Sequence, residues 1–370
     1  MVVEYGIRNA TIGDGQGLAQ LAHRGFKGYP FESVYQPQSL VDAITQGEIR
    51  IVAALKPELQ HIIGTAVLGI DGFMAEIKRV IVHPEYRNNH LASNMTKNLE
   101  RVAKRKKVHP YTDTRADQLG MQKASLGAGL KAITIESGKH VVYDHEVDVP
   151  GPGKEQLGPA RESMIHMTSL RADQSRLYDE LKNWPLALRE KLYTNIAKAL
   201  HNPAEKNKSV VEYKLPSALK VRTTILNQLE EHRNGFEIIH DEQDITVVQH
   251  GNVKITIIKP DASGFIETND HTTNEEIQYI LGLSEAIGLQ IITSYENVKD
   301  VKKAQLMDEC GLTPAMIRPW QTTKKGKPIW QAGFRKTMNG YEDCLHSIRL
   351  DKKVREQLEE FATTLKDKIL

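Results

Sequence analysis

The sequence EIKRVIVHPEYRNNHLASN, residues 76–94, joins an expected strand to an expected helix through a short polar turn. The strand ends at His83, the turn holds Pro84 and Tyr86, and apolar residues at helical spacing follow from Leu91. At such a junction several backbone N–H groups point at one spot beside the positive end of the helix. The segment therefore predicts an anion site for a phosphate or pyrophosphate. The alternative is an ordinary strand-to-helix turn in which an asparagine caps the helix.

The residues around this junction predict alternating strands and helices. The Asp71-Gly72 pair between two apolar runs is a hairpin signal, so we expect a strand meander just before the junction. The expected strands are 2–8, 49–55, 61–70, 74–83, 110–115, 131–136, 139–143 and 161–170, and the expected helices begin at Thr11 and Pro37 and span 89–107 and 117–128.

A similar pattern starts again after a polar helical connector. We expect strands at 236–240, 245–250, 253–259, 289–294, 312–319 and 329–335, and helices at 217–233, 273–287, 298–310 and 351–370. Both halves read β-β-β-α-β-α-β-β without clear residue identity, so the repeat is one of pattern. The expected domains are residues 1–172, a helical connector at 173–209, a second domain at 210–340 and a C-terminal helical segment at 341–370.

The composition excludes several classes of protein. Lys and Arg number 49 against 47 Asp and Glu in 370 residues, a net charge of +2, which argues against a dedicated nucleic-acid binder. No apolar run approaches the roughly 18 residues of a membrane span, and the start MVVEYGIRN does not resemble an export signal. The two cysteines make neither a disulfide framework nor a zinc site. We expect a cytoplasmic protein, monomeric or homodimeric, without a metal, a membrane or a nucleic-acid partner.

The junction resembles a known family. A strand followed by His-Pro-x-Tyr-Arg and a helix is similar to motif A of the GNAT superfamily of acyl-CoA N-acyltransferases, whose pattern is Gln/Arg-x-x-Gly-x-Gly/Ala. This chain has Arg87-Asn88-Asn89-His90-Leu91-Ala92, with matches at Arg87 and Ala92 and His90 in place of the middle glycine. The resemblance covers about residues 4–170. It implies an α/β (α+β) fold with a mixed, mostly antiparallel sheet flanked by helices, here as two tandem GNAT-like domains.

The resemblance also implies where acetyl-CoA, the co-substrate, would bind. In this family two neighbouring strands splay apart, and the pantetheine arm pairs with the exposed strand edge, which the resemblance places at Ile81 and Val82. The pyrophosphate would meet the backbone amides of the loop and the first helical turn, which here are Arg87, Asn88, Asn89, His90, Leu91, Ala92 and Ser93.

Glu76 is the first candidate for the catalytic base, because many relatives carry a carboxylate on this strand. The alternatives are a Glu76 that merely pairs with Lys78 or Arg79, and His83 or His109 as the base. Relatives often use a Tyr as the acid on the helix that corresponds to 118–129, which has no Tyr here. Tyr143 or Tyr111 would have to replace it.

The second half departs further from the family. Its expected strand-to-helix junction, KPDASGFIETNDHTTNEEI at 259–277, carries Asp261, Glu267 and Asp270, which would repel a pyrophosphate. We therefore expect a degenerate GNAT-like half without its own cofactor. The expected function is acetyl transfer to a small-molecule amine. The alternatives are acylation of a protein or peptide amine, and a non-catalytic acyl-CoA or metabolite sensor, which the His90 substitution and the missing Tyr suggest.

Overall fold

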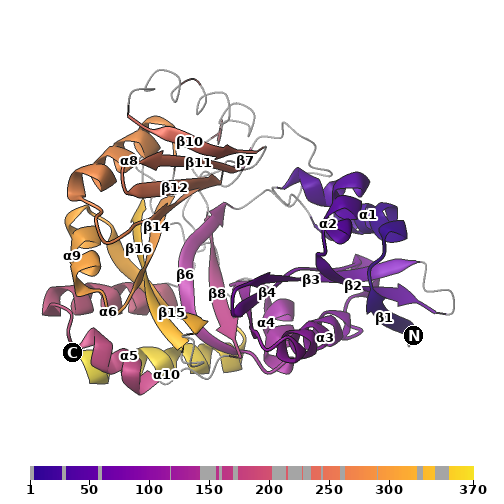
Figure 1. Cartoon of the computed structure of the whole chain (residues 1–370). Helices are drawn as coiled ribbons and strands as arrows, with labels where there is room; N and C mark the ends of the chain where they lie inside the picture. The colour runs from indigo at the N-terminus through magenta and orange to yellow at the C-terminus, as the bar shows by residue number, and fades with distance from the viewer. Residues whose placement is uncertain are drawn as a thin grey trace.

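Two seven-stranded sheets, each flanked by helices, and one two-stranded sheet form the described part of the protein (Figure 1). The structure is a computed structural model, and it describes residues 4–26, 31–56, 61–116, 118–141, 156–157, 161–169, 174–201, 214–215, 227, 235–242, 245–258, 263–289, 291–322, 328–337 and 350–370. The mixed α/β class and the tandem arrangement predicted from the sequence are confirmed. No helix among these residues has the length and apolar character needed to span a bilayer.

The first sheet has the strand order β1-β2-β3-β4-β5-β8-β6. Its neighbours are antiparallel except β4 and β5, which run parallel. The elements are β1 (Tyr5–Asn9), η1 (Ile12–Asp14), α1 (Gly15–Gly25), η2 (Glu32–Tyr35), α2 (Pro37–Thr45), β2 (Ile49–Leu55), β3 (Ile62–Asp71), β4 (Met74–Val82), η3 (Pro84–Tyr86), α3 (Leu91–Arg105), β5 (His109–Arg115), α4 (Leu119–Gly127), β6 (Lys131–Val141) and β8 (Arg161–Thr168).

Alternation along the strands explains why both faces of this sheet are covered. Ile51 and Ala53 of β2 pack under α3, whereas Val52 between them packs under α1 and α2. Gly25 lets the end of α1 lie directly on β4, because a Cβ there would stand 2.2 Å from Ile81 Cγ2. At the start of this unit the Thr11 N–H donates to Asp14 Oδ2 (2.7 Å), which caps the helical turn that begins after Thr11.

The second sheet has the order β10-β11-β12-β13-β14-β16-β15, and its parallel pair, β13 and β14, occupies the same two positions as β4 and β5. The remaining elements are β7 (Gln156–Leu157), α5 (Gln174–Leu181), α6 (Leu186–His201), β9 (Lys214–Leu215), β10 (Glu237–Asp241), β11 (Ile245–His250), β12 (Val253–Ile258), β13 (Ser263–Glu267), α8 (Asn274–Ala286), β14 (Ile291–Asn297), α9 (Val301–Glu309), β15 (Thr313–Thr322), β16 (Pro328–Thr337) and α10 (Lys352–Ile369). The two sheets therefore share one topology. Within the described residues, β11 begins at Ile245 soon after β10 ends at Asp241, without helices like α1 and α2 between them.

Two expectations about these elements are wrong. The junction expected as a long loop at 259–277 contains a strand, β13, which sits in the middle of the second sheet. The two strands expected at 131–136 and 139–143 form one strand, β6, with an irregularity between Glu136 and His140. The helix expected at 217–233 lies almost entirely outside the described residues.

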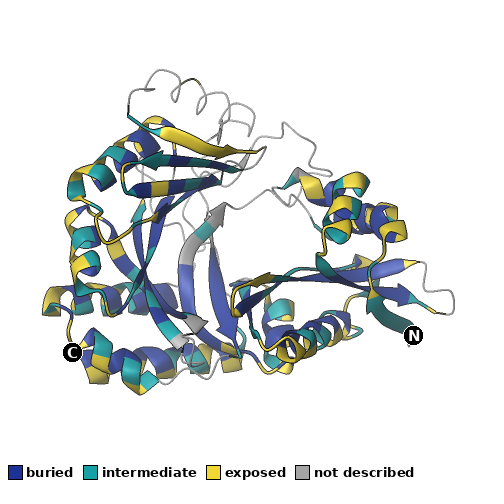
Figure 2. Ribbon diagram, viewed as in Figure 1, coloured by how far each residue is buried: buried dark blue, intermediate teal, exposed yellow. Residues whose placement is uncertain are grey.

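The sheets meet along their outer strands, where β6 of the first lies beside β15 of the second (Figure 1). One apolar cluster runs through this junction and joins Ile135 and Ile165 of the first sheet to Phe334 of the second, as well as to α5, α6 and α10. Figure 2 shows this continuous buried band, in contrast with the exposed edge strand β10. The segment expected to be a polar connector thus supplies helices whose apolar sides are buried.

Candidate active site

The parallel strands β4 and β5 pair only at their beginnings. Met74 to Glu76 pair with His109 to Tyr111, although β4 continues to Val82 and β5 to Arg115. Beyond this short pairing the two strands separate, which leaves one edge of β4 open. This is the splay that the family resemblance implies.

A bulge in β4 lies within the splay. Thr65 of β3 pairs with Ile81 and Val67 pairs with Lys78, so Arg79 and Val80 together oppose a single residue. Arg79 has φ 51°, in the left-handed region. A bulge leaves its extra residue out of the ladder and turns the strand locally, so a backbone N–H of this segment is free to face the splay.

The loop after β4 presents unpaired backbone donors. Asn88 (φ 66°) and His90 (φ 58°) are left-handed, and His90 begins α3 without a side-chain cap. Among the described residues, no hydrogen-bond acceptor meets the amides of residues 88–93. Uncapped amides at a helix start form an anion site, so the loop fits a pyrophosphate. His90 adopts the backbone conformation that normally favours glycine, and its side chain is exposed.

The corresponding helix of the second sheet is α8. At its start, two side chains accept hydrogen bonds from backbone N–H groups. The Glu276 N–H donates to Thr273 Oγ1 (3.3 Å), and the Thr273 N–H donates to Glu276 Oε2 (2.8 Å). The hydrogen bond from the Thr273 backbone, with others from Asn252, lowers the pKa of Glu276 below its usual value. A carboxylate therefore occupies this helix start, in contrast with the uncapped start of α3.

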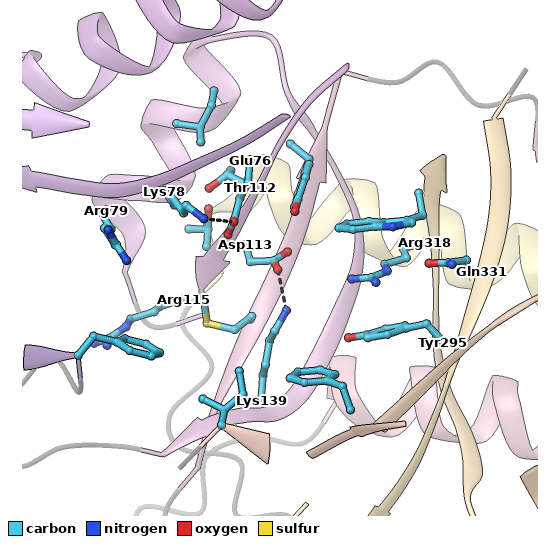
Figure 3. Close-up of a pocket in the computed structure, with 18 of the residues that line it drawn as sticks. Glu76, Lys78, Arg79, Thr112, Asp113, Arg115, Lys139, Tyr295, Arg318 and Gln331 are labelled. Atoms are coloured by element: carbon cyan, nitrogen blue, oxygen red, sulfur yellow. Dashed lines mark hydrogen bonds and ion pairs between the residues drawn. The ribbon is translucent and has the colours of Figure 1, made fainter. Parts of the chain in front are cut away.

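A cavity of about 960 Å³ lies between the two sheets and includes the splay. Figure 3 shows that both sheets contribute to it. Its polar and aromatic lining residues include Glu76, Lys78, Arg79, Tyr111, Asp113, Arg115 and Lys139 from the first sheet, with Phe265, Glu267, Tyr295, Glu296, Arg318, Trp320 and Gln331 from the second.

Glu76 lies at the last paired position of β4, directly opposite Tyr111 of β5. Its Oε2 is 3.1 Å from Lys78 Nζ, and its side chain is 29% exposed. The carboxylate therefore lines the cavity where the strands begin to separate, within reach of solvent and of a bound molecule.

Tyr111 lies opposite Glu76 and contributes a hydroxyl group to the same part of the cavity. Burial, followed by the negative charges of Glu76 and Asp113, raises the pKa of Tyr111 well above its usual value. The phenol therefore stays protonated and available as a donor. Tyr143, the other candidate acid, lies outside the described residues.

The two histidines considered as bases lie elsewhere. His83 is buried with Nε2 3.1 Å from Arg24 Nη1, and burial, then the Arg24 charge, lowers its pKa. His109 lies at the closed end of the splay, opposite Met74. Among the described residues that line the cavity neither histidine is present. The structure thus brings Glu76 and Tyr111 together, without His83 or His109.

A buried charged network beside the splay was not predicted. Lys139 Nζ is 2.6 Å from Asp113 Oδ2 and 2.9 Å from Glu136 Oε2, and the Tyr295 hydroxyl donates to Glu136 Oε1 (2.9 Å). His166 Nδ1 is 2.9 Å from Asp113 Oδ1. Burial alone would raise the pKa of Asp113, but Lys139 and His166 outweigh it and hold the pKa well below its usual value.

This network links both sheets, since Tyr295 belongs to β14. The sequence carried one signal for it, namely that Tyr111, Asp113 and Arg115 alternate along β5 and so share one face of the strand. Nothing in the sequence placed Lys139, His166 and Tyr295 beside that face.

Comparison with known proteins is consistent with this geometry. Residues 18–124 match the family model "Acetyltransferase (GNAT) family". No curated protein matches the chain. Similar solved structures include the ribosomal-protein-S18-alanine N-acetyltransferase of Escherichia coli, with 13% identity, TM-score 0.35, and coverage of 46% of this chain and 97% of that one.

Two further similar structures are complexes with coenzyme A or AcCoA. PaiA N-acetyltransferase of Thermoplasma acidophilum, in complex with coenzyme A, has 17% identity and TM-score 0.33, with coverage of 45% and 98%. A phosphinothricin acetyltransferase of Sinorhizobium meliloti, in complex with AcCoA, has 12% identity and TM-score 0.36, with coverage of 45% and 88%. Likenesses this distant do not define an acceptor. The family match, which includes β4, the loop and α3, identifies residues 18–124 as part of an acetyltransferase domain of the GNAT family.

Proposed function

We propose that this protein is an acyl-CoA-dependent N-acyltransferase that moves an acetyl group from acetyl-CoA to the amine of a small molecule. The observation that carries the proposal is the splay between β4 and β5. Unpaired amides at 88–93 follow one end of it, and Glu76 and Tyr111 face each other at the other end. A donor with a pyrophosphate at one end and a thioester at the other suits this arrangement.

Backbone groups of β4 would hold the donor along the splay. The His83 N–H donates to Ile63 O (2.9 Å), so by the alternation of an antiparallel ladder the groups of Val82 face the open edge. Val82 is therefore the better partner for a pantetheine arm. Ile81 faces β3, and its side chain packs in the core under α1.

Each group in the splay would have one role in the reaction. Acetyl-CoA supplies the acetyl group as a thioester, which a neutral amine attacks. Glu76 would take the proton from the incoming ammonium group, directly or through one water. A backbone N–H freed by the bulge at Arg79 and Val80 would meet the negative charge that develops on the carbonyl oxygen. Tyr111 would return a proton to the departing thiolate.

The second sheet supports a small acceptor over a folded protein. It closes the cavity opposite β4 and β5, with Phe265, Tyr295 and Trp320 among the lining residues. We propose that residues 210–340 are a degenerate GNAT-like domain that shapes this acceptor side, which the closed start of α8 supports. A cavity of this volume holds a small amine beside the acyl end of the donor.

Glu76→Gln tests the proposal, because it keeps the shape of the side chain and removes the base. We expect kcat/KM at neutral pH to fall by about 10²- to 10⁴-fold. The loss should shrink as the pH rises, since more of the amine then arrives neutral. Thiol release from acetyl-CoA over a panel of amines, followed spectroscopically against pH, measures both effects.

Glu85→Gln is the matched control, since Glu85 is exposed in η3 and makes the same change of charge outside the cavity. Full activity of Glu76→Gln with an unaltered pH profile would contradict the role of Glu76. Tight binding of acetyl-CoA by the unmodified protein, without turnover of any amine, would instead favour the sensor.

A further inference from the structure

Arg318 of β15 is a buried cation that faces the cavity. The residue is only 7% exposed, and Figure 3 shows its side chain directed from the second sheet toward Asp113 and Lys139. Its Nε has no hydrogen-bond partner, and no carboxylate of the described residues lies within 4 Å of it. Burial of a guanidinium whose hydrogen bonds are not all satisfied lowers the stability of the fold. The position of Arg318 therefore indicates a ligand that completes its hydrogen bonds.

Two aromatic rings fix the orientation of this guanidinium. Arg318 Cζ lies 3.5 Å from the centre of the Tyr295 ring and 3.9 Å from that of Trp320. Stacking on both faces excludes water from them and leaves the in-plane N–H groups as the donors. A planar, pre-oriented fork of N–H groups matches a carboxylate, which it can bind through two parallel hydrogen bonds.

Four acidic side chains around the cavity have other partners. Asp113 and Glu136 share Lys139, and Glu76 pairs with Lys78. Glu296 accepts hydrogen bonds from Ser294 (2.7 Å) and Thr268 (3.0 Å). None of these four carboxylates forms an ion pair with Arg318, so its N–H groups can bind an added anion.

The position of Arg318 relates that anion to the reacting amine. The Trp320 ring, which covers Arg318, lies 5.0 Å from the Tyr111 ring in an edge-on contact. Tyr111 in turn lies opposite Glu76, at the last paired position of β4 and β5. One molecule in the cavity can thus present an amine to Glu76 and an anionic group to Arg318.

We propose that Arg318 binds a carboxylate of the acceptor, so that the acceptor is an amino acid or another amine that carries a carboxylate. This inference rests on the proposed acetyltransferase function and specifies its substrate class. Arg318 acts in substrate binding and takes no part in the proton transfers.

Matched pairs of amines test the proposal on the unmodified protein. Each amino acid is compared with its carboxamide and with its decarboxylated amine, and thiol release from acetyl-CoA is followed. We expect kcat/KM to be about 10²-fold or more higher for the carboxylate of each productive pair. Arg318→Gln should remove this preference, mainly through KM, and Arg318→Lys should restore part of it. Arg355→Gln, at an exposed position of α10, should leave the preference unchanged.

A binding measurement separates this inference from the proposed function. Because Trp320 stacks on Arg318, its fluorescence should change when a carboxylate binds, and Trp320→Phe identifies that part of the signal. If no amine is turned over but amino acids still bind more tightly than their amides, the carboxylate site stands and the acetyltransferase function fails. Equal turnover or equal binding of carboxylate and amide would overturn the role of Arg318, as would a preference for amines that carry a phosphate.

Discussion

Lys139 holds together a group of buried charges that would otherwise repel one another. Its ammonium group lies between the carboxylates of Asp113 and Glu136, and its side chain is 11% exposed. Burial would lower the pKa of Lys139, but the two carboxylates outweigh it and hold the pKa well above its usual value. Such a network is stable only while every member keeps its partners.

Replacing Lys139 with Met should therefore destabilise the protein strongly. The variant leaves two buried carboxylates without their cation, a loss of about 3–5 kcal/mol in the free energy of unfolding. Lys104→Met is the control, since Lys104 pairs with Glu100 at a site where its side chain is 66% exposed. That surface pair is worth about 1 kcal/mol at most. Denaturant titration of both variants measures the difference.

The loss of unfolding free energy in Lys139→Met should decrease as the pH falls. In the native protein the pKa values of Asp113 and Glu136 are lowered, so their contribution is present above their usual pKa values and is lost only as the pH falls through the folded ones. Without Lys139, burial raises both pKa values, and protonation then relieves the repulsion. The loss should shrink as the pH is reduced from about 8 to 5. A loss that stays constant over this range would contradict this reading.

Single residues also show what the sequence could predict about the site. Glu76 was identified because it lies on the motif strand, and the structure places it in the cavity. Its partner Tyr111 was only an alternative to Tyr143. Arg318, Trp320 and Tyr295 could not be predicted as cavity residues, because they come from strands about 200 residues away that meet β5 only through tertiary packing.

The starts of two helices, α3 and α8, account for the difference between the sheets. The α3 start has left-handed residues and no side-chain cap, whereas the α8 start is filled by Thr273 and Glu276. One start thus leaves its positive dipole end available to an anion, and the other neutralises it internally.

Ala92→Asp should convert the open start into a filled one. A carboxylate in the first turn of α3 would repel the pyrophosphate, so we expect the affinity for acetyl-CoA to fall at least about tenfold, or 1.4 kcal/mol. The same charge should leave the helix itself as stable as before, or more stable by about 0.3–1 kcal/mol. Calorimetric titration and thermal denaturation measure the two effects.

Asn98→Asp gives the same charge change further along α3, beyond the first turn. Its affinity for acetyl-CoA should remain close to that of the unmodified protein. Unchanged affinity in Ala92→Asp would show that the pyrophosphate binds elsewhere.

Most strands and helices were predictable, because their signals are local. The meander β2-β3-β4 has long apolar runs separated by clear turns. The strand β13 was missed because Ser263–Glu267 is short, contains Gly264 and carries only two large apolar residues. Gly264 is required by its surroundings, since a Cβ there would stand 2.8 Å from both Ile255 Cδ1 and Ile292 Cδ1. Close packing between strands therefore decides this element, and a single sequence does not show it.

At the scale of the molecule, hydrogen bonds join elements of the first half to elements of the second. The backbone N–H of Ala132 in β6 donates to Gln357 Oε1 of α10 (2.9 Å), and the Asp351 N–H donates to Gln122 Oε1 of α4 (2.7 Å). Trp184 lies after α5, and its indole N–H donates to Val298 O beside the second sheet (2.7 Å). With the shared apolar cluster, these contacts should make the protein unfold in one cooperative step.

Acetyl-CoA should therefore stabilise parts of the protein that it does not touch. The three tryptophans, Trp184, Trp320 and Trp330, all lie outside the family-matched residues 18–124. At a donor concentration of 100 times Kd the stabilisation is about 2.7 kcal/mol, and the thermal midpoint reported by tryptophan fluorescence should rise by several degrees. Ala92→Asp should lose this shift. If acetyl-CoA raised the thermal midpoint measured by circular dichroism but not the one measured by tryptophan fluorescence, the two halves would unfold separately.

The open edge of β4 has a consequence for the order of events in turnover. The loop proposed to bind the donor lies past one end of the splay, and the proposed acceptor side of the cavity lies under the second sheet. Both substrates can thus be bound at once, so we expect the acetyl group to pass directly from the thioester to the amine. Initial-rate plots at several fixed amine concentrations should give intersecting lines, the pattern of a ternary complex. Acetyl-CoA alone should leave the mass of the protein unchanged.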